Sequence, residues 1–526
     1  MAGNIAAVAM IGRVLGDLLF EVSHGQPLEE WSKTNLNRQV PFTKRKYIKL
    51  KHWSGVWDKN AWKGAPMLEF AETFIDAPLA LCCGLIDPTL RRIPMRCVKI
   101  FTGLIGIVGL AFSLHASQNA FAADLVPRSA QMPAVIGIAS FNMAWAGTAG
   151  DFKRHLEICS APTVNWCDTR PRTLRGADAP TVEEQARADA CQAATITAAG
   201  GRSASMMMAP CNAYRFSDAP TRGVPPRDPA LLRNEAAYAG KLAGLRATVE
   251  NLIEHQHIRV IAFQEVKSKE TVVSVLGKFA NKFDVCMAAH DAFQTLGFAW
   301  DKSLSARPGQ CATHDALAIK YPVNDPAAFR RVRPGLALEL TINGGPVTFM
   351  NVHLKAGCAN AISTDRYPGR LVNDAHPNCE VFNRQVPILE DWLEAVALKT
   401  PRFVWLGDFN RLIDEELALN IANDQVRADG SNPAGVNKKD ASGKVATKYL
   451  WPEIADGVPV ALHQVPLSTK EGGCSGFVGL DHAVISDALK KLNPGTIASR
   501  KLAVRVPAGQ LMEVSDHCPR ILQLKF

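Results

Sequence analysis

Two polar side chains follow a buried apolar run near residue 405. The run 403–406 is short and apolar, as expected of a buried strand, and Gly407 breaks it. Asp408 and Asn410 come two positions apart, so on an extended chain both face one side while Phe409 turns to the core. A carboxylate beside a carboxamide suits a hard metal ion and a phosphate oxygen. The alternative is a simple turn.

The rest of the chain supplies partners for this pair. Further apolar segments, at 136–141, 260–263 and 347–352 and near the C-terminus, end in or carry polar residues of the same kind. Each of these residues alone is a weak signal, whereas the ordered set is a strong one. In chain order the residues are Asn142, Gln264, Glu265, His353, Asp481, His482, Ser515, Asp516 and His517.

This set and order resembles the endonuclease/exonuclease/phosphatase superfamily, which includes DNase I-like nucleases and sphingomyelinases, in a bacterial secreted or periplasmic form. The match runs from about Val135 to Phe526. The resemblance implies an α/β four-layer sandwich, in which two mixed β-sheets pack face to face with helices outside. The site is then expected where the strand ends converge.

Hydrolysis of a phosphodiester needs a base for the attacking water, relief of charge on the phosphorus oxygens and help for the leaving oxygen. His517 is the expected general base, held in the right tautomer by Asp481. Glu265 is the expected ligand of Mg²⁺ or Mn²⁺, with Ca²⁺ as a further candidate, and Asp516 and Asn142 complete the metal cluster directly or through water.

The resemblance assigns roles to three more residues. Asp408 would orient the attacking water or join a second ion, and Asn410 would hydrogen-bond the scissile phosphate. His353 would face a non-bridging oxygen or protonate the leaving group. The sequence shows no clear counterpart of the acidic residue that braces this histidine in DNase I-like enzymes, so the protonating role of His353 stays open.

These residues predict a divalent-metal-dependent phosphodiesterase, and within that class a secreted nuclease acting on DNA or RNA as a monomer without a stable protein partner. A lipid phosphodiesterase like sphingomyelinase, a small-molecule phosphatase and an inactive surface-binding protein of the same fold are the alternatives, because substrate choice lies in loops. Residues 123–526 lack an exposed aromatic cluster for membrane contact, which favours nucleic acid. The net charge of +9 is compatible with a polyanionic substrate.

Residues 95–122 have the three parts of a secretory signal peptide. A basic start at 95–99 precedes an apolar core at 100–114, and an Ala-x-Ala site ends at Ala122. The core is shorter than the roughly 20 residues of a membrane-spanning helix. We expect cleavage near Ala122, no membrane span in the mature chain, and a natural start at Met95, with residues 1–94 outside the natural protein. A membrane anchor preceded by a cytoplasmic extension, or a buried helix, are the alternatives.

Ten cysteines lie beyond residue 122, an even number without CxxC pairs. This pattern favours disulfides in an oxidising compartment over a zinc site or free thiols. Sequence alone does not fix their connectivity. The hypothetical pairs are Cys159–Cys167, Cys191–Cys211, Cys286–Cys311, Cys358–Cys379 and Cys474–Cys518.

The remaining organisation follows from local patterns. Residues 123–134 are an expected leader before the domain 135–526, and the polar stretch at about 147–230 is an insertion that forms either a lid or a surface decoration. Periodic leucines predict a helix over 231–257, and apolar runs predict a short strand at 315–320. An Asn-Gly-Gly turn at 343–345 predicts a hairpin.

Overall fold

The computed structural model describes residues 135–526, apart from 169–180, 219–225, 322–326, 361–376, 420–448, 457–460 and residue 498. The expected N-terminal extension, signal peptide and leader lie outside the described residues. Among the residues that are described, no helix is long and apolar enough to cross a membrane.

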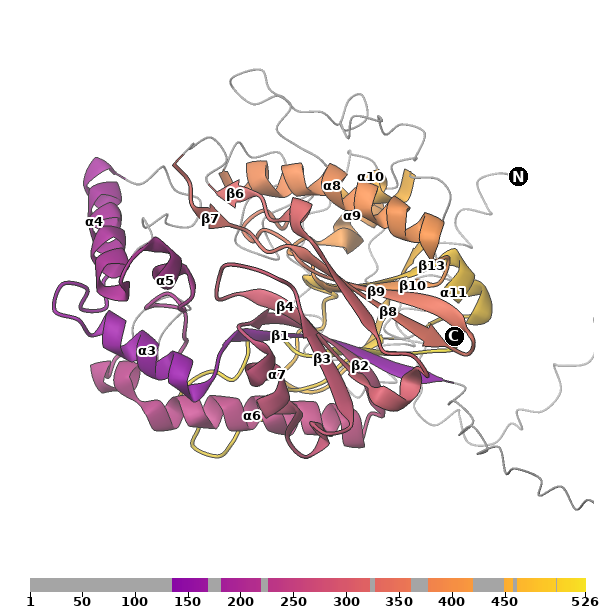
Figure 1. Cartoon of the computed structure of the whole chain (residues 1–526), viewed down its shortest axis with the longest axis horizontal. Coiled ribbons are helices and arrows are strands. Elements are labelled where there is room, and N and C mark those ends of the chain that lie inside the picture. Colours follow the sequence, from indigo (N-terminus) through magenta and orange to yellow (C-terminus); the bar gives the residue numbers. More distant parts are fainter. Residues whose placement is uncertain are drawn as a thin grey trace, which may run out of the picture. The chain divides into compact units, whose positions relative to one another are not determined.

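Two mixed β-sheets form the centre of the domain (Figure 1). The larger sheet has seven strands and the smaller has six. In spatial order the larger sheet contains β12 (Leu467–Lys470), β14 (Ser499–Lys501), β15 (Arg520–Leu524), β1 (Ile136–Ala146), β2 (Ile258–Val266), β4 (Thr295–Asp301) and β3 (Phe283–Met287). The smaller contains β11 (Leu462–Gln464), β13 (Asp481–Ser486), β10 (Phe403–Asp408), β9 (Gly345–His353), β8 (Gly335–Ile342) and β5 (Gln310–His314), and β6 (Lys320–Tyr321) pairs separately with β7 (Arg330–Arg331).

The central strands are buried on both faces, which explains their continuous apolar sequences. In β10, Val404 and Leu406 join the core between the two sheets, whereas Phe403 and Trp405 join the core under the outer helices. This alternation is the two-residue period of a strand. It builds one apolar layer between the sheets and a second layer outside each of them.

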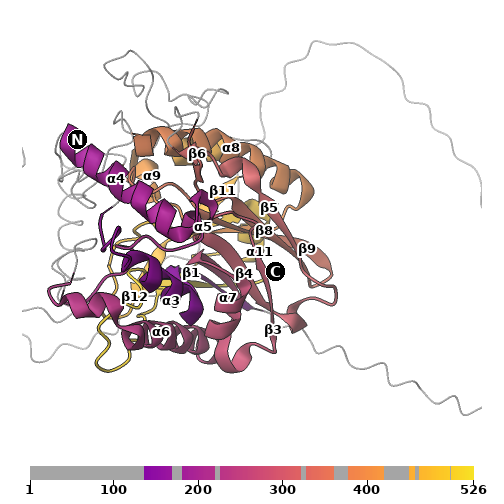
Figure 2. The ribbon, with the colours of Figure 1, turned by 60° about the vertical axis from the view of Figure 1, so that its left-hand side comes forward.

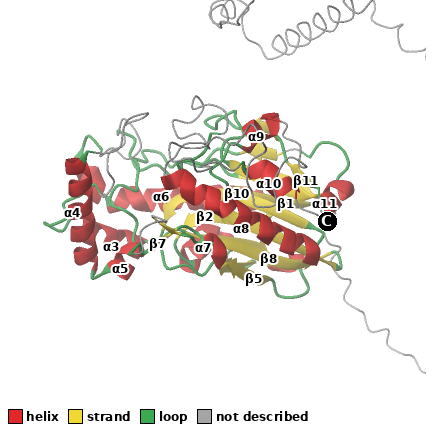
Figure 3. Ribbon diagram, turned by 90° about the horizontal axis from the view of Figure 1, so that it is seen from above, coloured by secondary structure: helices red, strands yellow, loops and turns green. Residues whose placement is uncertain are grey.

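Helices cover the outer face of each sheet (Figures 1 and 3). Helices α6 (Glu235–Glu254) and α7 (Lys269–Leu276) pack on the larger sheet through buried leucine and valine side chains. Helices α8 (Pro377–Lys399), α9 (Ile413–Leu419) and α10 (Leu450–Asp456) cover the smaller sheet, while the short α11 (Asp487–Leu492) follows β13. The predicted four-layer α/β/β/α sandwich is therefore confirmed.

The predicted hairpin is also confirmed, because β8 and β9 pair from Leu336–Asn351 to Ile342–Gly345. Asn343 and Gly344 have φ angles of 50° and 77°, the left-handed conformation that a two-residue turn of this kind requires. The expected strand at 315–320 is wrong. Strand β5 ends at His314, and the 3₁₀ turn Asp315–Leu317 carries Leu317 into the core under the helices.

The polar insertion contains three helices, α3 (Ala149–Cys159), α4 (Val182–Ala199) and α5 (Arg202–Met206), which lie together at one side of the sandwich (Figure 2). Thr148 and Thr181 cap the first two helices, each with an acidic residue three positions later. Short 3₁₀ turns, at Pro229–Arg233, Gly277–Phe279 and Lys302–Leu304, complete the described helical segments.

Five disulfides are present in the described residues, and three of them match the expected pairs: Cys286–Cys311, Cys358–Cys379 and Cys474–Cys518. The two pairs expected inside the insertion are wrong. The bridges are instead Cys159–Cys211 and Cys167–Cys191. The local pairing fails because Cys159 lies at the end of α3, where it packs against the later segment that carries Cys211. Helix α4 presents Cys191 to the loop that follows α3.

Candidate active site

Three predicted site residues lie side by side on neighbouring strands of the smaller sheet. His353 at the end of β9 is the register partner of Asp408 at the end of β10, and Asp408 is the partner of Asp481 at the start of β13. Gly407 makes this row possible. It has a φ of 140°, and a Cβ at this position would lie 2.0 Å from the Val352 carbonyl oxygen.

The larger sheet brings Asn142 and Glu265 to the same place. Strands β1 and β2 are parallel, and their register shifts between Asn142 and Ala146. Asn142 therefore lies inside β1, just before this irregularity, and does not end the strand as the sequence suggested. Glu265 accepts a hydrogen bond from the Trp145 backbone nitrogen at 3.1 Å, which fixes one carboxylate oxygen. Positive φ angles at Ala144, Trp145 and Glu265 mark the constrained backbone here.

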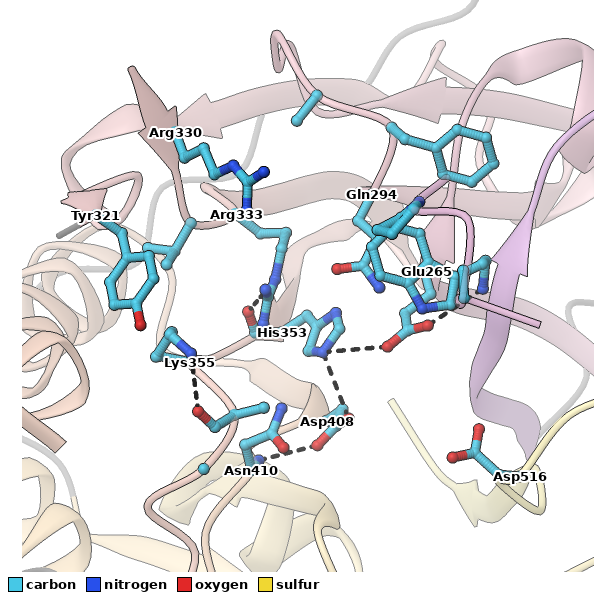
Figure 4. A pocket seen from close by; sticks show the side chains of 18 of the residues that line it. Glu265, Gln294, Tyr321, Arg330, Arg333, His353, Lys355, Asp408, Asn410 and Asp516 are labelled. Atoms are coloured by element: carbon cyan, nitrogen blue, oxygen red, sulfur yellow. Dashed lines mark hydrogen bonds and ion pairs between the residues drawn. The ribbon is translucent and has the colours of Figure 1, made fainter. Parts of the chain in front are cut away.

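Asp408 contacts several members of this group, and Figure 4 shows its approach to His353. Its Oδ2 atom accepts a hydrogen bond from Asn142 Nδ2 at 3.2 Å and lies 3.5 Å from His353 Nε2 and 3.7 Å from His517 Nε2. His353 Nε2 lies 3.7 Å from Glu265 Oε1. Side chains from both sheets thus meet around one carboxylate, which supports the hypothesis that they form a single site.

His517 approaches this group from the C-terminal loop. Its Nδ1 donates to Asp481 Oδ2 at 2.8 Å, which leaves Nε2 directed toward Asp408. Two buried cations hold the surrounding backbone: Lys241 donates to the Val514 carbonyl at 2.5 Å, and Arg520 donates to the Asp481 carbonyl at 2.5 Å. The loop is therefore fixed on both sides of the histidine.

The pKa values of these groups are coupled through their contacts. Burial raises the pKa of Asp408 to about 7, although His517 opposes the rise. Burial would also raise the pKa of Asp481, but the contact with His517 holds it below its ordinary value. Burial would lower the pKa of His517, yet Asp481 and Asp408 together raise it well above the usual range. The described protein groups alone leave an excess of buried negative charge on Asp408.

The donor set fits a divalent cation. Asp408, Asp481 and His517 offer ligand atoms that all lie within 4.8 Å of one another. Glu265 adds another buried carboxylate, and His353 Nε2 lies between it and Asp408. Oxygen-rich clusters of this kind suit Mg²⁺ or Mn²⁺.

Two predicted residues are placed differently from the rest. Asp516 lines the cavity but is exposed, and it lies apart from the Glu265, His353 and Asp408 group (Figure 4). Asn410 is buried, and its Nδ2 donates to the Leu354 carbonyl at 3.0 Å, while its backbone nitrogen donates to Asp408. A carboxamide carries two hydrogens, so one remains for a substrate oxygen.

Gln264, which precedes the metal-ligand candidate, has a structural position. Its Nε2 donates to Asn351 Oδ1 at 2.7 Å, and Asn351 Nδ2 donates to the Phe263 carbonyl at 2.9 Å. These side chains join the two sheets by hydrogen bonds beneath the site. A buried polar pair that is fully bonded fixes the relative position of the elements that carry it.

The sequence analysis missed a cationic wall made by Arg330, Arg333 and Lys355 (Figure 4). Arg333 Nε donates to the His353 carbonyl at 3.0 Å, and the guanidinium also donates to the Leu354 carbonyl. Burial lowers the pKa of Lys355 to about 7, with Arg333 adding to the effect. Its ammonium lies 4.9 Å from the centre of the Tyr321 ring. Two sequence features could have revealed this wall: Arg330 and Arg333 come shortly before the apolar strand β8, and Lys355 comes two positions after His353.

All these groups line one cavity of about 870 Å³. Its charged lining residues are four acidic ones (Glu265, Asp408, Asp481 and Asp516) and five basic ones (Arg330, Arg331, Arg333, Lys355 and Lys501). Residues of the insertion line another part of the same cavity, among them Ile196, Met206 and Met208. The insertion therefore borders the site and is more than a distant surface decoration.

The fold and the site define a two-sheet α/β sandwich with a polar, carboxylate-rich centre at its strand ends, and solved structures of the endonuclease/exonuclease/phosphatase family are among those that match it. One is a family protein from Leptotrichia buccalis, 14% identical, with a TM-score of 0.30 over 56% of this chain and 95% of that one. Another is truncated Caenorhabditis elegans TDP2, 13% identical, with a TM-score of 0.30 over 55% and 92%.

A third match is D. rerio TDP2 complexed with a single-strand DNA product, 14% identical, with a TM-score of 0.30 over 54% of this chain and 93% of that one. These likenesses concern the fold alone. Neither the family models nor the curated proteins give a match to the sequence. The arguments for function below rest on the geometry of the site.

Proposed function

We propose that the protein is a divalent-metal-dependent phosphodiester hydrolase, and that its substrate is DNA or RNA. The observation that carries this proposal is the His517–Asp481 pair, with its 2.8 Å hydrogen bond, placed beside a buried carboxylate that also contacts His353. A histidine oriented by one carboxylate and directed at a reaction centre is the arrangement needed to take a proton from water.

His517 would act as the general base through Nε2, because Nδ1 is engaged by Asp481. Asp481 is a positioning residue that fixes the tautomer and stabilises the charged imidazole. Asp408 lies between His517 and His353, so it would orient the attacking water toward phosphorus. Asn410, adjacent to Asp408, would donate a hydrogen bond to a phosphate oxygen.

The cation would be held by Glu265 together with Asp408, by Asn142 directly or through water, and by the more distant Asp516 through water. When bound, such an ion neutralises charge on the phosphate oxygens and assists the leaving oxygen. Arg333 would add a positive charge on the protein side, since its guanidinium is fixed on the His353 and Leu354 carbonyls next to the carboxylates.

His353 has the acidic neighbours that the sequence did not reveal. Its Nε2 lies 3.7 Å from Glu265 and 3.5 Å from Asp408, and its side chain is buried. Nε2 therefore faces the carboxylates of the proposed reaction centre. His353 would therefore serve as a donor to a non-bridging oxygen or to the leaving group.

The charge of the cavity favours a polyanion. Its five basic residues outnumber its four acidic ones even before a cation binds, and the basic group includes Arg330, Arg333 and Lys355 on one wall. A nucleic acid carries further phosphates next to the scissile one, so a cationic wall beside the reaction centre suits it.

The five disulfides indicate an oxidising compartment. A secreted or periplasmic enzyme, released by cleavage near Ala122, accounts for them. We also propose that the enzyme works as a monomer.

A substrate panel tests the proposal. The purified protein is incubated with plasmid DNA, RNA and sphingomyelin, each with Mg²⁺ and with a chelator. Cleavage of DNA or RNA only in the presence of the metal is the expected result. Cleavage of sphingomyelin alone would point to a lipid phosphodiesterase, and no cleavage of any phosphodiester would reject the enzyme proposal.

A further inference from the structure

The cavity has an apolar, aromatic wall beside Glu265, across the site from the cationic one. Trp145 donates its backbone nitrogen to Glu265, so its side chain begins next to that carboxylate. The Trp145 and Phe293 rings lie 5.8 Å apart between centroids, at an interplanar angle of 38°. Figure 4 shows Arg330, Tyr321 and Lys355 on the other side of the site from Glu265. The two walls therefore differ in the chemistry that they offer a substrate.

The backbone at Trp145 is held in an uncommon conformation. Its φ is 60°, and that of Ala144 is 47°, values that residues other than glycine adopt at an energetic cost. The β1–β2 pairing is interrupted at the same place, between Asn142 and Ala146. This turn leaves the indole half-buried on the lining of the cavity. The local strain thus presents a large aromatic surface next to the proposed reaction centre.

The insertion completes this wall. The Phe293 backbone nitrogen donates to the Met206 carbonyl at 2.8 Å, which attaches the end of α5 to the aromatic pair. Met206, Met208 and Ile196 all line the cavity. The bridges Cys159–Cys211 and Cys167–Cys191 hold the segments around them. Methionine side chains adapt to flat ligands and make favourable contacts with aromatic rings.

We propose that Trp145, with Phe293 and Met206, forms a stacking subsite for the nucleobase next to the scissile phosphate. The inference rests on the proposed function and specifies its substrate class: phosphodiesters that carry an aromatic base beside the bond to be cleaved. With the phosphate at the carboxylate centre, the wall on the Glu265 side receives the base, and the cationic wall faces the phosphate backbone on the other side. Stacking on an aromatic ring accepts any base, so the subsite confers affinity without sequence specificity.

Electrostatics separates a nucleobase from the other group that tryptophan binds well, a quaternary ammonium. The basic lining residues exceed the acidic ones, and the Lys267 ammonium lies 5.6 Å from the centre of the Phe293 ring. Lys267 is paired with Asp151. Glu265 is the acidic lining residue next to Trp145, and the proposed cation neutralises it, while none of the described insertion residues that line the cavity is acidic. A neutral aromatic ring is the better occupant.

The test compares two oligonucleotides that differ only by one abasic site next to a single cleavable bond. The measured quantity is the ratio of kcat/KM for the base-bearing substrate to that for the abasic one, which does not depend on the amount of active enzyme. We expect a ratio of about ten or more for the unchanged protein, since stacking of one base contributes roughly this factor. In Trp145→Ala the ratio should fall toward one, whereas Trp145→Phe should retain most of it.

Met207→Ala is the matched control, because Met207 neighbours Met206, is exposed and is not among the lining residues. Its ratio should equal that of the unchanged protein, and Met206→Ala should lower the ratio. A ratio near one in the unchanged protein, or an unaltered ratio in Trp145→Ala, would overturn the stacking subsite while leaving the hydrolase proposal intact. A second outcome would assign the wall to a quaternary ammonium headgroup. In that case the protein hydrolyses nitrophenyl phosphorylcholine, Trp145→Ala loses this activity, and the kcat/KM ratio of the two oligonucleotides is one. Failure to cleave either oligonucleotide would reject both proposals.

Discussion

Asp408 and Asp481 are direct partners in the antiparallel pairing of β10 with β13, so two buried carboxylates stand side by side. His517 compensates part of this charge by its 2.8 Å hydrogen bond to Asp481. The other part remains on Asp408, whose pKa is raised to about 7 by burial and by Asp481. The pairing register of two strands thus places the oriented histidine beside a second buried carboxylate.

Replacing Asp481 by Asn should remove the orientation of His517 and lower kcat by about two to four orders of magnitude, the usual contribution of a general base. It should also move the acidic limb of the pH–rate profile to lower pH. The reason is that Asp481 raises the pKa of His517, and the base works only after it loses its proton. Asp487→Asn, just beyond the other end of β13, is the control and should leave the profile unchanged. An unshifted limb in Asp481→Asn would contradict the assigned base.

Glu265→Gln should weaken the binding of Mn²⁺ at least tenfold, because one buried anionic ligand is lost while the shape of the side chain is kept. Titration calorimetry of the purified protein measures this change independently of activity. The control is Glu339→Gln. Glu339 lies on β8, and its carboxylate pairs with Lys399, so this variant should bind Mn²⁺ like the unchanged protein. Equal affinities in both variants would place the ion away from Glu265.

The Cys474–Cys518 bridge joins the loop before β13 to the residue after His517. Replacing both cysteines by Ala should lower kcat by at least tenfold, because His517 loses its fixed position. The Cys286–Cys311 bridge is the control, since it joins the edge strands β3 and β5. By chain entropy, either loss costs about 3.5–4 kcal/mol of stability, so thermal unfolding should respond to both. Equal kcat values in the two double variants would show that the first bridge only stabilises the fold.

His155 makes stability depend on pH. It is buried, its Nδ1 donates to the Ala209 carbonyl at 3.0 Å, and burial lowers its pKa to about 4. Between about pH 6.5 and 4 the unfolded chain binds a proton on this residue that the folded chain does not. Stability should therefore fall as the pH drops through this window, by about 3 kcal/mol from His155. Urea unfolding should show a smaller pH slope in His155→Asn than in His255→Asn, which changes an exposed histidine. Identical slopes would mean that His155 is accessible to protons in the folded state.

Much of the fold was accessible from local sequence patterns. The run 403–406 and the Asn343–Gly344 turn specify a buried strand and a hairpin through side-chain period and backbone conformation, which are local properties. The disulfides inside the insertion were not accessible in this way. Their pairing depends on how α3 and α4 pack, and short loops gave the wrong partners.

The site residues were likewise only partly predictable from the sequence. Asp408 and His353 were recognisable because each lies at the end of an apolar run, and Asp481 because it stands in the ordered set of polar residues; the strand register then brings the three together. Arg333 was missed because an arginine before a strand is usually exposed, whereas here its partners are carbonyls of a different strand. The aromatic wall was missed because the contact between Trp145 and Phe293 joins distant segments.

The most direct measurement is the cleavage of one defined oligonucleotide by the unchanged protein and by His517→Ala, with Mg²⁺ and with a chelator. The account predicts cleavage by the unchanged protein with Mg²⁺ only, and a loss of at least a hundredfold in the variant at an unaltered thermal unfolding midpoint. Cleavage that persists in the chelator, or an equal rate in the variant, would contradict it.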